Sequence, residues 1–105
     1  MKIWVNGCFD ILHRGHFELF NYAKSLGDYL VVGIDSDEKV AQDKGPDRPY
    51  NNLEDRHYAL ESLKAIDQIY VFDSKDHLEW LVQKEQPDIL VVGSDWKGKE
   101  IVGGQ

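Results

Sequence analysis

The sequence predicts an α/β fold, a three-layer sandwich in which helices cover both faces of a parallel sheet. Short apolar runs alternate with segments whose apolar residues recur at helical spacing. The apolar runs are continuous rather than alternating, which is typical of strands buried on both faces. The connections are short, so successive strands are expected to join through crossover helices. With 105 residues, the chain is expected to form a single domain, residues 1–105.

The chain begins with a strand, a helix and a second strand. Residues 2–6 (KIWVN) form an apolar run that stops at Gly7. Residues 15–26 carry a helical apolar stripe, and Gly27 is expected to cap that helix at its C-terminal end. Residues 29–34 (YLVVGI) form the second buried strand.

The middle of the chain is polar. Residues 37–42 are expected to be helical, and residues 43–52 are expected to form a loop because they contain Gly and Pro. Asn51 with Glu54 resembles a capping box that opens the next helix. The apolar residues of this segment that should face inward are Leu53, Leu60 and Leu63.

The last third repeats the alternation. Residues 68–72 (QIYVF) read as a strand, and residues 76–86 read as a helix that Pro87 ends. Residues 88–92 (DILVV) form the fourth strand. The tail at residues 101–105 is expected to be too short for another packed element. The whole pattern is Rossmann-like.

Composition and charge exclude several classes of function. The formal net charge of -7 argues against a nucleic-acid surface, because binding a phosphate backbone needs a basic patch. No apolar run approaches the ~20 residues of a membrane-spanning helix, and the first residues lack the pattern of a signal peptide. We therefore expect no membrane association and a cytoplasmic location. The single cysteine, Cys8, allows neither an intrachain disulfide nor a cysteine-based metal site.

Ligands in such sheets bind beyond the carboxyl ends of the strands, at a switch point in strand order. Gly7 and Gly93 end two predicted strands and lead into polar segments. The first of these, GCFDILHRGH at residues 7–16, connects a strand to a helix. Gly7 permits the turn, and Gly15 leaves room beside the backbone for a phosphate or a base. The start of the helix favours an anion.

His13 and His16 are three residues apart, so both are expected on one side of the first helical turn. Two imidazole donors there suit a triphosphate and can stabilise the charge that moves onto departing pyrophosphate. An attacking phosphate oxyanion would need neither a covalent intermediate nor a strong general base. A lone histidine at a helix start is more often a cap, but this pair with Gly15 between them favours a catalytic role.

GCFDILHRGH resembles the G-x-F-D-x-x-H-x-G-H signature of the cytidylyltransferase-like nucleotidyltransferases. The similarity continues along nearly the whole chain. Residues 26–38 resemble the second strand of that family, and residues 48–56 resemble the R-P-x-N-x-x-x-R segment of its ADP-heptose synthase branch. Residues 87–96 resemble the nucleotide-base segment of the heptose and glycerol-3-phosphate branches. Residues 101–103 look heptose-like, whereas residues 96–99 look closer to the glycerol-phosphate branch.

This resemblance implies a role for each matching position. His13 and His16 would contact the triphosphate and stabilise the transition state, and Lys44 in the flexible loop would close over the phosphates. Asp10 would orient the phosphates or a Mg²⁺ ion, and Arg56 would bind phosphate or pair with a carboxylate. The remaining positions would surround the nucleotide through backbone groups or the base pocket: Gly7, Cys8, Phe9, Gly15, Gly93, Asp95 and Trp96.

Simpler roles are open at several of these positions. Asp10 could cap a turn, Cys8 could be a small buried hydrophobe, and Phe9 could belong to the core. Lys44 could be a solvated loop charge. Arg56 could form an ordinary helical salt bridge.

Relatives of this type continue into a further strand and a helix whose start carries a phosphate-binding Ser-Thr stretch. The sequence reaches Gln105 without such a stretch, so the predicted fold lacks the family's C-terminal strand and helix. We expect truncation. A partner chain that supplies the missing part and a reduced form of the protein are the alternatives.

The predicted activity is transfer of a nucleoside monophosphate from ATP, or CTP, to a sugar phosphate such as heptose 1-phosphate. Pyrophosphate would be released, and Mg²⁺ would be bound through the triphosphate. The alternatives are a CTP-dependent glycerol-3-phosphate cytidylyltransferase and, in another class, a non-catalytic nucleotide-binding module. A fragment of an aminoacyl-tRNA synthetase does not fit, because the chain is acidic and has no room for an anticodon-reading part. The resemblance also implies a homodimer.

Overall fold

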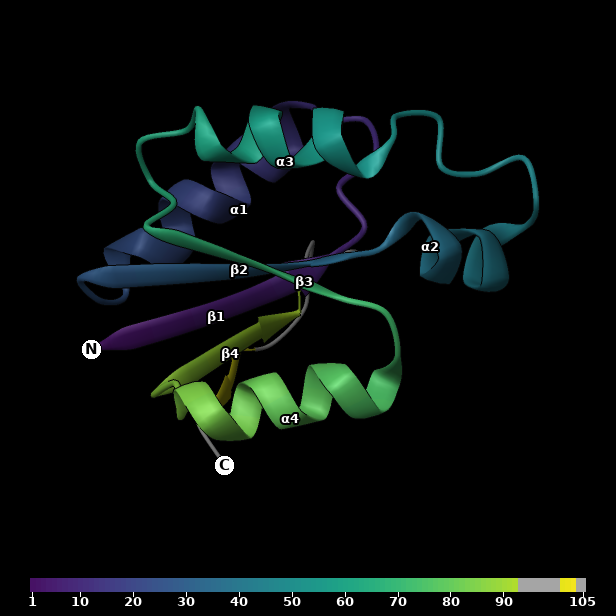
Figure 1. Ribbon diagram of the computed structural model, residues 1–105. Coiled ribbons are helices and arrows are strands. Elements are labelled where there is room, and N and C mark those ends of the chain that lie inside the picture. The colour runs from purple at the N-terminus through teal and green to yellow at the C-terminus, as the bar shows by residue number, and fades with distance from the viewer. Residues whose placement is uncertain (93–100, 104–105) are drawn as a thin grey trace.

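The computed structural model describes residues 1–92 and 101–103, which form a five-stranded sheet with helices on both faces (Figure 1). The strand order is β3-β2-β1-β4-β5; β1 to β4 are parallel, and β5 is antiparallel to β4. The predicted α/β, Rossmann-like class is therefore confirmed. The strands are β1 (Lys2–Gly7), β2 (Tyr29–Asp35), β3 (Gln68–Phe72), β4 (Ile89–Val92) and β5 (Ile101–Gly103).

Helices α1 and α3 lie on one face of the sheet, α4 lies on the other, and α2 lies beyond the end of β2 (Figure 1). Their bounds are α1 (Arg14–Ser25), α2 (Asp37–Lys44), α3 (Leu53–Glu61) and α4 (Lys75–Glu85). Each begins after a residue whose side chain accepts a backbone N–H that the first turn leaves unpaired. These caps are His13, Ser36, Asn52 and Ser74. None of the helices in the described ranges has the length and apolar character that crossing a membrane requires.

The sheet buries alternate residues of each strand against the two helical layers. On the face beneath α1 and α3, Ile3 and Val5 pack with Phe20 in one core cluster. On the opposite face, Trp4 packs with Leu81 of α4 in a second cluster. β1 is central, and its pairing with β2 and β4 fixes the position of its carboxyl end between those two strands.

Helix α3 begins one residue later than the capping pattern predicts. Asn52 caps it, since its side-chain oxygen accepts the backbone N–H of Asp55 at 2.9 Å. Asn51 instead binds Asp10 through its backbone and side-chain amides. The prediction of an Asn51 cap is wrong because a tertiary contact engages Asn51 while its neighbour has the same capping chemistry.

Gly27 does not cap α1 in the way that the pattern predicts. Leu26 is the capping residue and keeps a right-handed conformation, and Gly27 is not among the residues of positive φ. A Cβ on Gly27 would run into the carbonyl oxygen of Met1. Glycine is therefore required here by a close approach of two backbone segments.

The prediction that the C-terminal tail forms no further element is also wrong. Residues Ile101–Gly103 pair with β4 as β5. The open edge of β4 offers unpaired backbone groups, so even a short segment can add to the sheet there.

Candidate active site at the carboxyl edge of the sheet

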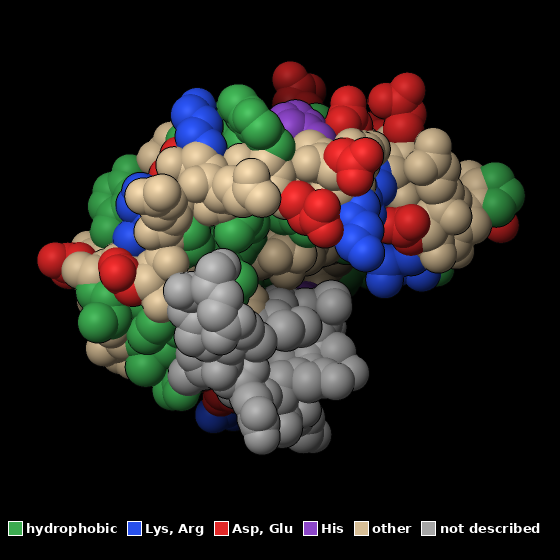
Figure 2. Space-filling model, turned by 90° about the horizontal axis from the view of Figure 1, so that it is seen from below, with side chains coloured by type: hydrophobic (Ala, Val, Ile, Leu, Met, Phe, Trp, Pro, Cys, Tyr) green, Lys and Arg blue, Asp and Glu red, His purple; other side chains and the backbone are tan. Residues whose placement is uncertain are grey.

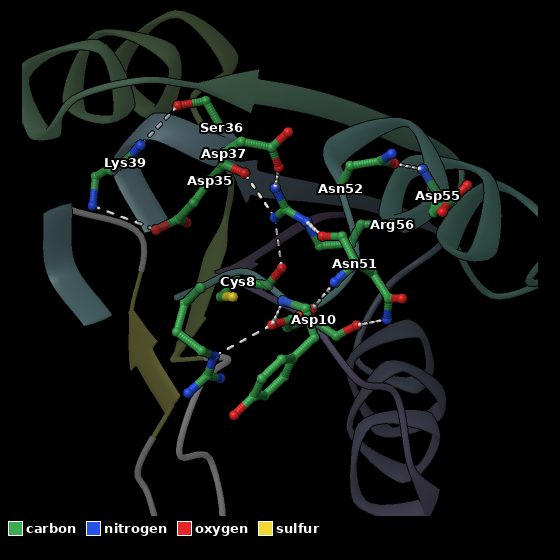
Figure 3. A network of polar contacts seen from close by, with 12 residues as sticks. Cys8, Asp10, Asp35, Ser36, Asp37, Lys39, Asn51, Asn52, Asp55 and Arg56 are labelled. Atoms are coloured by element: carbon green, nitrogen blue, oxygen red, sulfur yellow. Dashed lines mark hydrogen bonds and ion pairs between the residues drawn. The ribbon is translucent and has the colours of Figure 1, made fainter. Parts of the chain in front are cut away.

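The strand order changes direction at β1, and the candidate site lies there. β1 pairs with β2 on one side and with β4 on the other, so the chain winds outward from β1 in both directions. Ligands bind at such a point beyond the carboxyl ends of the strands. Polar contacts join three segments there (Figure 3): residues 8–10 after β1, residues 35–37 at the end of β2, and residues 48–52 before α3.

His13 and His16 form a reciprocal capping box at the start of α1. Nδ1 of His13 accepts the backbone N–H of Gly15 at 3.0 Å. Nδ1 of His16 accepts the backbone N–H of His13 at 3.2 Å. The ring centroids lie 4.2 Å apart. The structure therefore brings the two predicted histidines together, and their spacing satisfies two backbone donors of the first turn.

The capping bonds determine which nitrogen of each neutral ring carries the proton. A ring nitrogen that accepts a hydrogen bond is unprotonated, so each neutral ring carries its hydrogen on Nε2. Neither Nε2 atom has a hydrogen-bond partner in the part of the chain that the structure describes, so both can donate to a ligand. Burial lowers the pKa of His16, and the nearby His13 ring lowers it further. His16 is therefore neutral at physiological pH.

The turn between β1 and α1 is largely buried. Phe9 has a φ of 49°, which is uncommon for a residue with a side chain. Its ring packs edge-on against His16, with 5.6 Å between centroids. Burial raises the pKa of the Cys8 thiol, so the thiol stays protonated and is not a nucleophile at neutral pH. A Cβ on Gly15 would lie 2.8 Å from Cε1 of His13, so this glycine makes room for that ring.

Asp10 is buried and binds the loop that precedes α3. Its Oδ1 accepts the backbone N–H of Asn51 and its Oδ2 that of Tyr50, each at 2.7 Å. Arg48 Nε lies 3.6 Å from Oδ2. Burial opposes ionisation, but the backbone hydrogen bonds from Asn51 and Tyr50, together with Arg48, hold the pKa of Asp10 below its usual value. Asp10 is thus a carboxylate, and each of its oxygens is engaged by the loop.

Arg56 is the second buried member of this network, and its side chain is 0% exposed. Its Nη1 donates to the carbonyl oxygens of Cys8 at 3.0 Å and Asp35 at 2.8 Å. Its Nε donates to the carbonyl of Asn51 at 3.1 Å, and its Nη2 to the carboxylate of Asp37 at 2.7 Å. Of the two roles that the resemblance implies, this geometry favours pairing with a carboxylate over contact with phosphate.

A pocket of about 310 Å³ opens beside the β1 turn, between α2 and α4. Lys44 lines it as the last residue of α2, so this lysine is helical and does not lie in the predicted loop. The ends of three parallel strands also line the pocket, through Asn6, Asp35 and Phe72. A cavity lined by both charged and apolar side chains suits a small ligand with polar groups.

Lys39 brings a second positive charge to the pocket, and the sequence analysis did not single it out. Its ammonium group lies 2.6 Å from the carboxylate of Asp43 and 3.4 Å from that of Asp35. The hydrogen bond to Asp43 raises the pKa of Lys39, which stays charged. Basic and acidic side chains gather next to one another at the end of the molecule that contains α2 (Figure 2). The i, i+4 spacing of these three residues, directly after a strand, is the signal that could have found them.

No group of three His, Cys, Asp or Glu side chains within residues 1–92 is placed to hold a metal ion. Asp10 does not fit a direct Mg²⁺ ligand, because each of its oxygens accepts a hydrogen bond from the loop backbone. The predicted base-pocket residues Gly93, Asp95 and Trp96 lie outside the described residues.

The fold and the histidine pair together define a class of nucleotide-binding α/β protein, and comparison with known proteins identifies the family. Residues 4–102 match the model of the family described as cytidylyltransferase-like. The chain belongs to this family of nucleotidyltransferases, which confirms the resemblance predicted from GCFDILHRGH.

Individual relatives agree with this assignment. The bifunctional protein HldE of a Nitratiruptor species is 50% identical over 101 residues, which are 96% of this chain and 22% of that protein. HldE of Wolinella succinogenes is 48% identical over 101 residues, covering 96% of this chain and 21% of that protein. The crystal structure of the lipopolysaccharide core biosynthesis protein from Thermoplasma volcanium matches with a TM-score of 0.76 and 29% identity, covering 86% of this chain and 71% of that chain. The chain spans about a fifth of the length of these HldE proteins.

Proposed function

We propose that this domain transfers a nucleoside monophosphate from ATP to a sugar phosphate such as heptose 1-phosphate and releases pyrophosphate. The observation that carries the proposal is the capping box of His13 and His16, which leaves two Nε2 donors at a helix N-terminus. That position combines hydrogen-bond donors with the positive end of the helix dipole. The name of the Thermoplasma structure, a lipopolysaccharide core biosynthesis protein, supports a saccharide acceptor.

The reaction requires little covalent chemistry from the protein. An oxygen of the acceptor phosphate attacks the α-phosphorus, and a new P–O bond forms. The bond from the α-phosphorus to the bridging oxygen breaks, and its electron pair leaves with pyrophosphate. His13 and His16 donate from Nε2 to the phosphate oxygens on which charge increases, which stabilises the transition state more than the ground state. Mg²⁺ would be held by the triphosphate as part of the substrate and would neutralise some of its charge.

The pocket beside β1 is the proposed acceptor site. Lys44 supplies positive charge for the acceptor phosphate, and Lys39 can add to it when the phosphate replaces its ion pairs with Asp43 and Asp35. The carboxylates of Asp35 and Asp43 can accept hydrogen bonds from sugar hydroxyls. The pocket shares Gly7 with the segment that leads to the histidines, which supports its use by the second substrate.

Pyrophosphate release with matched substrate pairs tests the proposal. ATP with heptose 1-phosphate is expected to give pyrophosphate and an ADP-sugar. Release only with CTP and glycerol 3-phosphate would assign the alternative activity. ATP binding in a calorimeter without release from any pair would assign a non-catalytic nucleotide-binding module. Sedimentation of the same sample tests the homodimer.

A further inference from the structure

Two buried charged residues cross-link the segments that meet at the carboxyl edge of the sheet (Figure 3). Asp10 accepts hydrogen bonds from the backbone of residues 48–52. Arg56 donates to the segment after β1, to the segment after β2 and to the same loop. One residue supplies acceptors and the other supplies donors, so together they satisfy backbone groups of the loops and of the last residue of β2. We call Asp10 and Arg56 the brace.

The brace holds the residues on both sides of Phe9. The carbonyl of Cys8, which precedes Phe9, accepts a hydrogen bond from Arg56 at 3.0 Å. The carbonyl of Asp10, which follows Phe9, accepts one from the side-chain amide of Asn51 at 2.6 Å. Between them, Phe9 keeps a φ of 49°, a left-handed conformation that is unfavourable for a residue with a Cβ. Hydrogen bonds on both sides of Phe9 thus hold this unfavourable conformation in place.

Phe9 transmits this constraint to the histidines. Its ring lies between the core and the site, 5.1 Å from the Phe20 centroid and 5.6 Å from that of His16. His16 is in turn bonded to the backbone of His13, whose ring centroid is 4.2 Å away. A displaced Phe9 would consequently move both imidazoles.

We propose that Asp10 and Arg56 are positioning residues that hold Phe9 and thereby orient the paired histidines, and that neither contacts the triphosphate or its metal ion. The proposal rests on the proposed function, in which the histidines act on the triphosphate. The Asp10 and Arg56 side chains are only 4% and 0% exposed. A phosphate ligand needs an accessible guanidinium, and a metal ligand needs a carboxylate oxygen that is open to the ion.

The first experiment follows the whole chain by NMR without any substrate. The side chain of Asp10→Asn has a single acceptor oxygen, so the backbone amides of Tyr50 and Asn51 should exchange with solvent roughly tenfold faster or more. The ring ¹⁵N and ¹H signals of His16 should shift at the same time. Faster exchange of the two amides with unchanged His16 signals would overturn the proposal.

Asp67→Asn is the matched control for this experiment. Asp67 also accepts a backbone N–H, that of Leu30 at 2.7 Å, but at the opposite edge of the sheet. The control variant should speed exchange at Leu30 and leave the His16 ring signals in place. A His16 shift of equal size in the control would overturn the proposal, because it would show that a general weakening of the fold is enough to move the His16 ring.

The second experiment separates positioning from ligand binding by kinetics with ATP and Mg²⁺. Asp10→Asn and Arg56→Lys should lower kcat roughly 10- to 100-fold. The KM for ATP and the half-saturating Mg²⁺ concentration should stay within about twofold of wild type. A raised KM or a shifted Mg²⁺ requirement at unchanged kcat would identify the residues as ligands and overturn the proposal. Wild-type kcat in Arg56→Lys would overturn it as well, since lysine keeps the charge and loses the bridging geometry.

Asn51→Ala keeps the proposal testable if those variants do not fold. It removes the side-chain bond to the Asp10 carbonyl from an exposed residue, so the fold should persist. The His16 ring signals should shift in the same direction as in Asp10→Asn, by a smaller amount. If they do not shift, the proposal that Asp10 and Arg56 position the histidines is overturned. These signals need no turnover, so a wild-type chain that releases no pyrophosphate would refute the proposed function alone.

Discussion

The two edges of the sheet hold their polar residues in different ways. At the amino edge, where the parallel strands begin, charges pair near the surface: Lys24 and Asp67 lie 2.5 Å apart with side chains 33% and 29% exposed. At the carboxyl edge, the charged groups of Asp10 and Arg56 are buried and bind backbone groups of several loops. The polar contacts at the amino edge link the starts of strands, whereas those at the carboxyl edge order the loops that carry the histidines.

This difference separates contacts that stabilise from contacts that position. A pair near the surface contributes little, because water can solvate either partner when the other is removed. A buried network is sensitive to the loss of any member, since a buried polar group without a partner costs free energy. In this network Arg48 Nε, 3.6 Å from Asp10 Oδ2, is already buried without a hydrogen bond to any residue that the structure describes. The buried charges of Asp10 and Arg56 lie at the edge that holds the proposed active site, and each of the following changes tests that contrast.

The largest effect is expected at the histidine pair. His16→Ala removes an Nε2 donor that acts on the developing charge, so turnover should fall by a factor on the order of 10²–10³ with a much smaller change in KM. Steady-state pyrophosphate release measures both quantities. His57→Ala is the control, because His57 lies on α3 and its ring is 3.9 Å from Glu61. An equal loss in that variant would show that the catalytic assignment is misplaced.

Two glycines, one at each edge, should respond in opposite ways to alanine. In Gly15→Ala the new methyl group meets only the His13 ring, which can rotate away by giving up its capping bond to the Gly15 N–H. The unfolding free energy should therefore fall by no more than about 1 kcal/mol, while turnover falls roughly 10- to 100-fold. In Gly27→Ala the methyl group meets the backbone of Met1, which cannot rotate away. That variant should lose about 1–3 kcal/mol of unfolding free energy and keep its turnover per folded molecule. Urea unfolding measures the stability of both variants, and steady-state kinetics measures their turnover. A Gly15→Ala variant that keeps its turnover, or a Gly27→Ala variant that loses turnover but not stability, would contradict the contrast between the two edges.

The pH dependence should reflect the lowered pKa of His16. Burial and the neighbouring His13 ring disfavour the charged form, so the folded state binds fewer protons than the unfolded state between the lowered pKa and 6.5. The His16 contribution to stability should therefore be fully present above pH 6.5 and be lost as the pH falls through the lowered pKa. The acid limb of the kcat/KM profile, which reports the free enzyme, should also lie below pH 6.5. NMR titration of the ring measures this directly, and a value at or above 6.5 would contradict it.

The smallest effect is expected at the amino edge. Asp67→Asn weakens a partly exposed carboxylate that accepts the Leu30 N–H and pairs with Lys24. The unfolding free energy should fall by about 1 kcal/mol, because the remaining amide can still accept one bond. kcat and KM should match wild type. A clear loss of turnover in this variant would show that the two edges are coupled and that the contrast is too simple.

Local patterns predicted the elements and the centre of the site. Alternation of apolar runs with helical stripes predicted the four parallel strands and four helices, and where both ends were predicted they lie within two residues of the observed ones. The pair His13 and His16 was accessible from the sequence because both lie in one ten-residue segment whose spacing sets their relation in the first turn of α1. Gly27 was misread because its requirement comes from Met1, which reaches it only when β1 and β2 pair.

The amino-acid order alone was enough to determine the fold class, the family and the histidine pair, because periodicity and a compact motif express interactions between residues close in sequence. Only the folded molecule decided which of two adjacent asparagines caps α3, and that Lys39 joins Lys44 at the pocket. It also decided that Asp10 binds Asn51, 41 residues away, and that Arg56 binds the Cys8 carbonyl, 48 residues away. Such partners meet only after the sheet forms, and burial then makes their hydrogen bonds obligatory.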